Sequence, residues 1–139
     1  QGIRFEIAPD RITGLPARYG RLNLGLELYG STILRPERAA VFGATPIVHY
    51  SYPLTEWVSP YFEFGAGPVY LGLVTSEQER SGFSFYDQVG AGLEFTPSDQ
   101  VSILVGYRFG HFSHGGTRET KNRGIETDTV LFGLSFKLP

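Results

Sequence analysis

The sequence predicts an all-β protein, a small antiparallel β-barrel that crosses a membrane. Almost every apolar run is broken at every second position, which is the period of a strand whose two faces differ. One face of these segments is apolar, with Asp87 as the charged exception, whereas the other collects charges, glycines and tyrosines. No continuous apolar stretch approaches the roughly 20 residues of a membrane helix, but a barrel strand needs only about 9 to 11.

Seven segments show the strand period. The clearest is 21–29, in which Leu22, Leu24, Leu26 and Leu28 share one face. In the next segment Pro46 removes one ladder hydrogen bond, so we predict a bulge or kink there. The seven segments are residues 2–8, 21–29, 40–50, 61–70, 85–95, 101–113 and 129–138.

The mixed face of these segments distinguishes a barrel from a soluble sandwich. In a sandwich this face would meet water, whereas in a small membrane barrel it packs as a charge-paired interior. The apolar face of the barrel strands then meets lipid, and we expect this of the four leucines of 21–29 and of Val105, Phe132 and Leu134. Long connections at 31–38, 74–82 and 114–125 alternate with shorter turns, as the two rims of a barrel require, and this favours the barrel. The charges on the mixed face are Arg4, Glu6, Arg21, Glu27, Glu63, Glu94, Arg108 and Lys137.

The strand count is odd, although a bacterial barrel of antiparallel strands closes with an even number. Unpaired strand edges are costly in hydrocarbon. We therefore expect an eight-stranded type of barrel, in which a segment upstream of Gln1 or a partner chain supplies the missing strand.

Length and composition limit the remaining possibilities. Residues 1–139 make one domain, because no linker or repeat divides them. The formal charge of −2 and the lack of a basic cluster give no reason to expect nucleic acid. Cysteine is absent and the three histidines follow no metal-binding spacing, so we predict no metal and no cofactor. No signal peptide is visible at the start of this sequence, and if there was one it has been removed.

A candidate catalytic group lies where segment 101–113 ends. The apolar face of that segment ends in His111 and Ser113, and Glu126 follows in phase after the connection. A serine hydroxyl becomes a nucleophile when an imidazole takes its proton, and a carboxylate orients that imidazole. Residues i and i+2 of a strand share a face, so His111 and Ser113 can meet. The alternative is that they merely mark the polar end of a membrane strand.

These residues carry a resemblance. The segment HFSHGG at 111–116, followed by NRGIE at 122–126 and an aromatic-rich final strand, resembles the lipid A 3-O-deacylase (PagL) family. The resemblance implies an eight-stranded outer-membrane barrel that removes an ester-linked acyl chain from lipid A. It implies catalytic roles for His111, Ser113 and Glu126, and it assigns the oxyanion site to Asn122 and Gly116. This chain departs from the family pattern at His114, where an Asn is usual. Its connection between the His and the Asn is also one residue longer.

Other polar residues have simpler interpretations. His49 lies on the mixed face and is expected to be a hydrogen-bonded interior residue, whereas His114 is expected to be a solvated loop histidine. Three basic residues of the 114–125 connection either face solvent or meet the phosphates of lipopolysaccharide. They are Arg118, Lys121 and Arg123.

We therefore predict an esterase of the bacterial outer membrane that acts on lipid A or lipopolysaccharide in the outer leaflet. The first alternative is a catalytically silent barrel of the same family that serves as a structural or partner-binding subunit. A third interpretation is a soluble β-barrel that binds an apolar ligand.

Overall fold

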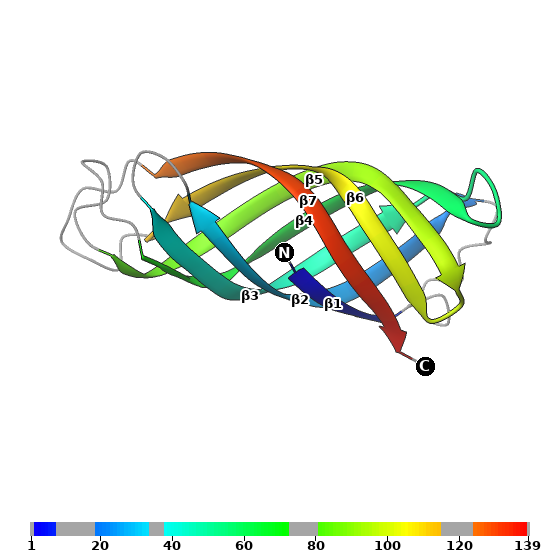
Figure 1. The fold of residues 1–139 in the computed structure, drawn as a ribbon, viewed down its shortest axis with the longest axis horizontal. Helices are drawn as coiled ribbons and strands as arrows, with labels where there is room; N and C mark the ends of the chain where they lie inside the picture. The colour runs from blue at the N-terminus through cyan, green and yellow to red at the C-terminus, as the bar shows by residue number, and fades with distance from the viewer. Residues whose placement is uncertain (1, 8–18, 34–37, 73–80, 115–123, 139) are drawn as a thin grey trace.

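The strands of this chain close into one barrel (Figure 1). The computed structural model describes residues 2–7, 19–33, 38–72, 81–114 and 124–138. Neighbouring strands along the chain pair antiparallel, so the predicted small antiparallel barrel is confirmed. Within the described residues, no helix is long and apolar enough to cross a membrane. The strands are β1 (Gly2–Ile7), β2 (Arg21–Ile33), β3 (Ala39–Ser51), β4 (Val58–Leu71), β5 (Gly82–Ser98), β6 (Val101–Ser113) and β7 (Ile125–Leu138).

The barrel closes with seven described strands because one pair is parallel. β1 pairs with β7 from Gly2 opposite Gly133 to Ile7 opposite Leu138. A parallel ladder also satisfies backbone N–H and C=O groups, so an odd number of strands can close. The described strands close without a strand from an upstream segment or a partner chain, so the expectation of such a strand finds no support in the described part of the chain.

Proline interrupts one ladder without shifting it. The pairing of β3 with β4 stops after Gly43 opposite Val69 and resumes at Ile47 opposite Gly65 in the same register. Pro46 lies in this gap and has no N–H to donate. The predicted bulge is therefore absent at Pro46, and the register shift lies instead between Phe95 of β5 and Ser98.

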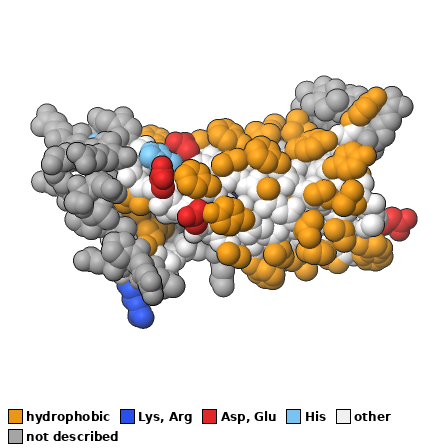
Figure 2. All heavy atoms as spheres, turned by 90° about the horizontal axis from the view of Figure 1, so that it is seen from above, with side chains coloured by type: hydrophobic (Ala, Val, Ile, Leu, Met, Phe, Trp, Pro, Cys, Tyr) orange, Lys and Arg blue, Asp and Glu red, His pale blue; other side chains and the backbone are white. Residues whose placement is uncertain are grey.

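The apolar face of the strands lies on the outside of the barrel. Figure 2 shows hydrophobic side chains as a broad band on the visible wall, with acidic side chains toward its ends. Leu26 in the middle of β2 is 45% exposed and Phe132 of β7 is 62% exposed, as predicted. Leu22, the second residue of β2, is half-buried. Predicted outward residues that are also exposed are Leu24, Leu28, Val105 and Leu134.

The charged face fills the interior. Arg4 of β1 donates to Glu27 at 2.7 Å and to Glu63 at 2.6 Å. Arg108 of β6 donates to the same two carboxylates, at 2.7 Å and 2.6 Å. We call Arg4, Arg108, Glu27 and Glu63 the interior charge cluster, and none of the four is more than 3% exposed. It joins β1, β2, β4 and β6 across the lumen.

Further polar contacts extend this cluster toward the end of the barrel where β6 begins. His49 is fully buried, 3.0 Å from an Arg4 nitrogen and 3.5 Å from Glu94, so its predicted interior role is confirmed. Glu94 also accepts a bond from Ser102 and pairs with Lys137 at 3.1 Å. The predicted interior charges are thus confirmed, except that Arg21 at the start of β2 and Lys137 near the end of β7 are half-buried.

Leu26→Arg should destabilise the barrel by about 2 to 4 kcal/mol, because it places a charge on the outer wall at mid-strand. Reversible unfolding in phospholipid vesicles measures this change. Leu54→Arg is the matched control: Leu54 is 64% exposed in the connection between β3 and β4, and its replacement should cost about 1 kcal/mol or less. Equal effects of the two substitutions would contradict the assignment of the outer wall.

Glu63→Gln should cost about 3 to 5 kcal/mol, because two buried arginines then lose a charged partner. The same unfolding measurement applies. Glu56→Gln, at an exposed position between β3 and β4, should change stability by about 0.5 kcal/mol or less. A Glu63 variant as stable as the Glu56 variant would show that the interior charge cluster does not hold the strands together.

Candidate active site

The candidate site lies at the end of the barrel where β6 ends and β7 begins. The strand period continues to the last residue of β6, so His111 and Ser113 project outward while Phe112 projects inward. Both outward residues are half-buried. Phe112 stacks on Tyr86 with ring centroids 4.3 Å apart, in a small apolar cluster inside the barrel. This packing holds the end of β6 in the wall and thereby places the two outward side chains.

The strand register adds Glu126 to this pair. Glu126 of β7 lies directly opposite His111, and its side chain is on the outer face. Directly opposite residues of an antiparallel pair have Cβ atoms about 4.5 to 5.5 Å apart, close enough for an imidazole to meet a carboxylate. The structure therefore brings together the three predicted residues, His111, Ser113 and Glu126, on one outward patch.

Asp87 is a fourth member of this patch, and no role was predicted for it from the sequence. It lies opposite His111 on the other side, on β5. Asp87, His111 and Glu126 thus form one row across three neighbouring strands, and we call this the outer row. Asp87 was recognisable only as the charged exception on the apolar face of its segment. Its position opposite His111 depends on the register of β5 with β6, which shifts beyond Phe95.

A further outward carboxylate near the outer row already has a partner. Asp128 of β7 lies opposite Phe109 and accepts a hydrogen bond from the Tyr107 hydroxyl. Glu126 is the carboxylate of β7 that is aligned with His111, so Asp128 serves as a neighbouring reference position.

The imidazole of His111 packs against a glycine just before β7. Gly124 is buried and has a φ of 78°, in the left-handed region. An ideal Cβ atom built on Gly124 would lie 2.5 Å from the Nε2 atom of His111. No side chain fits between this backbone and the ring.

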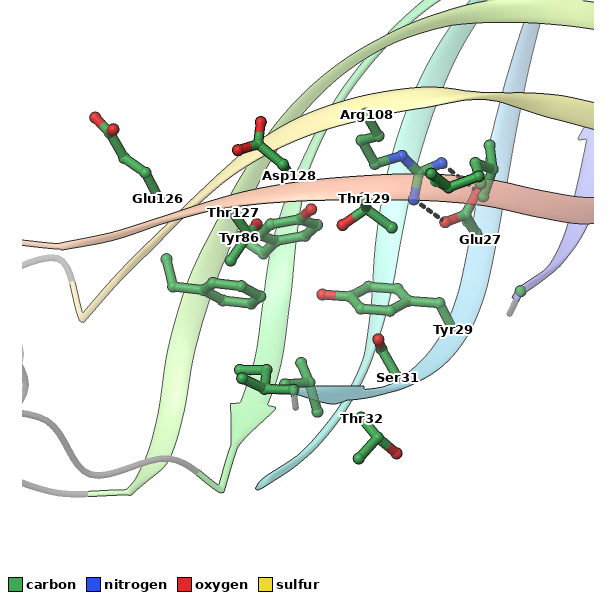
Figure 3. A pocket seen from close by; sticks show the side chains of 16 residues that line it. Glu27, Tyr29, Ser31, Thr32, Tyr86, Arg108, Glu126, Thr127, Asp128 and Thr129 are labelled. Carbon is green, nitrogen blue, oxygen red and sulfur yellow. Dashed lines mark hydrogen bonds and ion pairs between the residues drawn. The ribbon is translucent and has the colours of Figure 1, made fainter. Parts of the chain in front are cut away.

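A cavity of about 670 Å³ lies inside this end of the barrel (Figure 3). Tyr29, Tyr86 and Thr129 are among its lining residues, and Arg108 of the interior charge cluster also borders it. His111 and Ser113 do not line this cavity. Glu126 is among its lining residues, although its side chain is exposed on the outer face. His111 and Ser113 therefore face the surroundings of the barrel, and Glu126 lies where the cavity meets the outer wall.

Several other residues singled out from the sequence do not belong to this outward patch. His114 is only 1% exposed, so the expectation of a solvated loop histidine is wrong. The inward alternation of the strand continues one residue past β6 and takes His114 into the interior. Among the described residues, no group of three or more His, Asp or Glu side chains is placed to hold a metal ion. The other predicted site residues lie outside the described part of the chain, namely Gly116, Arg118, Lys121, Asn122 and Arg123.

Comparison with known proteins supplies a family. The family model described as lipid A 3-O-deacylase (PagL) matches residues 14–135. A crystal structure of the outer membrane enzyme PagL is similar to this barrel, with a TM-score of 0.73 and 22% sequence identity. The similarity covers 94% of this chain and 84% of that chain. No match to a curated protein was found.

Proposed function

This chain belongs to the lipid A 3-O-deacylase (PagL) family of outer-membrane ester hydrolases, and we propose that Ser113, His111 and Glu126 carry out its deacylase reaction. The substrate is lipid A, or the lipopolysaccharide that contains it, in the outer leaflet of the bacterial outer membrane. The observation that carries the proposal is the outer row. It aligns an imidazole with a carboxylate on the outer wall, with a serine two residues away on the same face.

The first half of the reaction forms an acyl-enzyme. The Oγ atom of Ser113 attacks the ester carbonyl while His111 takes the hydroxyl proton. Glu126 orients the imidazole and stabilises its charged form. When the tetrahedral intermediate collapses, the bond to the sugar oxygen breaks, and His111 returns the proton to that oxygen.

The second half releases the fatty acid. A water molecule gives a proton to His111 and attacks the acyl-serine carbonyl, and the Ser113 oxygen leaves and recovers the proton. Water reaches the patch because it lies at the end of a membrane strand. An acyl ester of lipid A also lies at the hydrocarbon boundary, so it can meet an outward site without entering the lumen.

The connection between β6 and β7 supplies further proposed contacts. The family resemblance assigns oxyanion stabilisation to the Asn122 side chain and the Gly116 backbone. Arg118, Lys121 and Arg123 carry charges that suit the phosphates of lipid A. These roles are proposed from the sequence, in which all five residues lie between His114 and Gly124.

Ser113→Ala and His111→Asn should each lower the rate of lipid A ester cleavage by several orders of magnitude, because each removes a reacting group. The rate is measured with purified protein in detergent, by mass spectrometry of the released fatty acid and the remaining lipid. Ser98→Ala, an exposed serine at the far end of the barrel, is the matched control and should keep full activity. Undiminished activity in Ser113→Ala would remove the nucleophile assignment. A parent protein inactive on every acylated lipid would favour the catalytically silent barrel.

Glu126→Gln should lower the rate roughly 10²- to 10⁴-fold, because an amide cannot stabilise the imidazolium. Asp128→Asn, on the same strand and the same face, should change it by about threefold or less, because Asp128 is bonded to Tyr107 rather than aligned with His111. The same cleavage assay compares the two variants. A larger loss in Asp128→Asn would show that the wrong carboxylate of β7 has been assigned.

Asn122→Ala should reduce the rate on the order of 10² to 10³ if its side chain donates to the oxyanion. Steady-state kinetics should place this loss in kcat, since the oxyanion exists only after the attack. A loss confined to KM would instead indicate that Asn122 binds the ground-state substrate.

A further inference from the structure

We infer that Gly124 is a positioning residue for His111, which requires a residue without a side chain at this place. Its backbone forms the surface against which the imidazole rests. The role of Gly124 in turnover rests on the proposed function, whereas its contact with the ring does not.

Two separate constraints coincide at Gly124. Its φ of 78° is a conformation that glycine adopts readily and that alanine disfavours. The second constraint is space: a Cβ atom there would overlap the Cε1 atom of His111 and lie 2.5 Å from Nε2 and 3.1 Å from Nδ1. All three nearest atoms belong to the one imidazole ring. Asparagine tolerates the backbone conformation but carries the same Cβ atom. It therefore satisfies the first constraint and violates only the second.

The collision can be relieved by movement of the ring. The clashing atoms belong to a side chain that can rotate, so a substituted barrel remains able to fold while the imidazole is displaced. Relief requires a shift of several tenths of an ångström to about 1 Å, and a misplacement of 1 Å can cost about 10²-fold in rate. The ring is thereby moved relative to both Ser113 and Glu126.

The place of Gly124 in the chain explains why this contact sets the geometry of the outer row. Gly124 lies two residues before Glu126. The segment that carries the carboxylate therefore also provides the surface that stops the imidazole. Any shift of the start of β7 moves the Glu126 carboxylate and the surface that contacts the imidazole together. The distance between His111 and Glu126 is therefore kept.

Gly20 provides a matched control within the same protein. It has a φ of 93°, and a Cβ atom there would lie 2.6 Å from the hydroxyl oxygen of Tyr50 and 2.8 Å from the carbonyl oxygen of Ser51. The backbone strain and the collision with a ring are thus similar, and at Gly20 the Cβ atom also meets a backbone oxygen, so this control is at least as disruptive to the fold. Gly20 is placed next to β2 at the end of the barrel opposite to the outer row, so its substitution does not touch His111.

The experiment compares Gly124→Ala, Gly124→Asn and Gly20→Ala in the ester-cleavage assay, with the unfolding of each variant measured in parallel. Both Gly124 variants should lose about 10²-fold in kcat while KM stays within about twofold. Gly20→Ala should lose stability to a similar extent and keep kcat within about threefold. Equal losses of kcat in Gly124→Ala and Gly20→Ala would overturn the inference, because strain alone would then explain both. Full activity in Gly124→Asn would also overturn it.

A second measurement separates this inference from the proposed function. The Cε1–H signal of His111 is followed by NMR in a Ser113→Ala background and identified by its disappearance in His111→Asn. Gly124→Ala should move this signal, whereas Gly20→Ala should leave it in place. An unmoved signal would refute the contact even in an active enzyme. A moved signal in a parent protein without esterase activity would refute the proposed function and retain the contact.

Discussion

The structure depends on charges that can be buried only when the barrel is closed. Arg4 and Arg108 share the carboxylates of Glu27 and Glu63, and these four residues come from four different strands. A buried ion without its partner costs several kcal/mol, so any open arrangement of the strands leaves an uncompensated charge. This explains how a strand of only six residues closes the sheet. β1 brings Arg4 to Glu27 and Glu63, and it also pairs with β7 in the parallel ladder.

The interior charge cluster fills the middle of the barrel, whereas the proposed catalytic residues lie on the outer wall. Tyrosines and the interior charge cluster occupy the lumen, and the cavity near the site is separated from His111 and Ser113 by the wall itself. The outer row occupies the rim of an apolar surface, where water and hydrocarbon are both within reach. This arrangement suits a substrate that cannot leave the membrane. For the proposed lipid A reaction, the position of the site at the rim favours a lipid substrate before any particular contact is considered.

The sequence was sufficient to predict which face of its strand each residue occupies, because this depends only on the alternation of side chains along a strand. Alternation assigned Leu26 to the outside, Glu63 to the inside, and His111 with Ser113 to one outward face. Features that depend on register or closure could not be predicted in this way. Asp87 needed the exact pairing of β5 with β6, and the parallel closure needed the position of Arg4 in three dimensions. His114 was assigned to solvent because a loop was expected to begin there, whereas the inward alternation continues for one more residue.

The outer row is built from three strands that are consecutive in the chain. Asp87, His111 and Glu126 come from β5, β6 and β7, so two hairpins are enough to assemble the row, and each side chain finds its neighbour through a single antiparallel ladder. The closing contact with β1 lies beyond β7. During folding the outer row can therefore form before the barrel closes, and over evolution the first strands can change in length or number without displacing it.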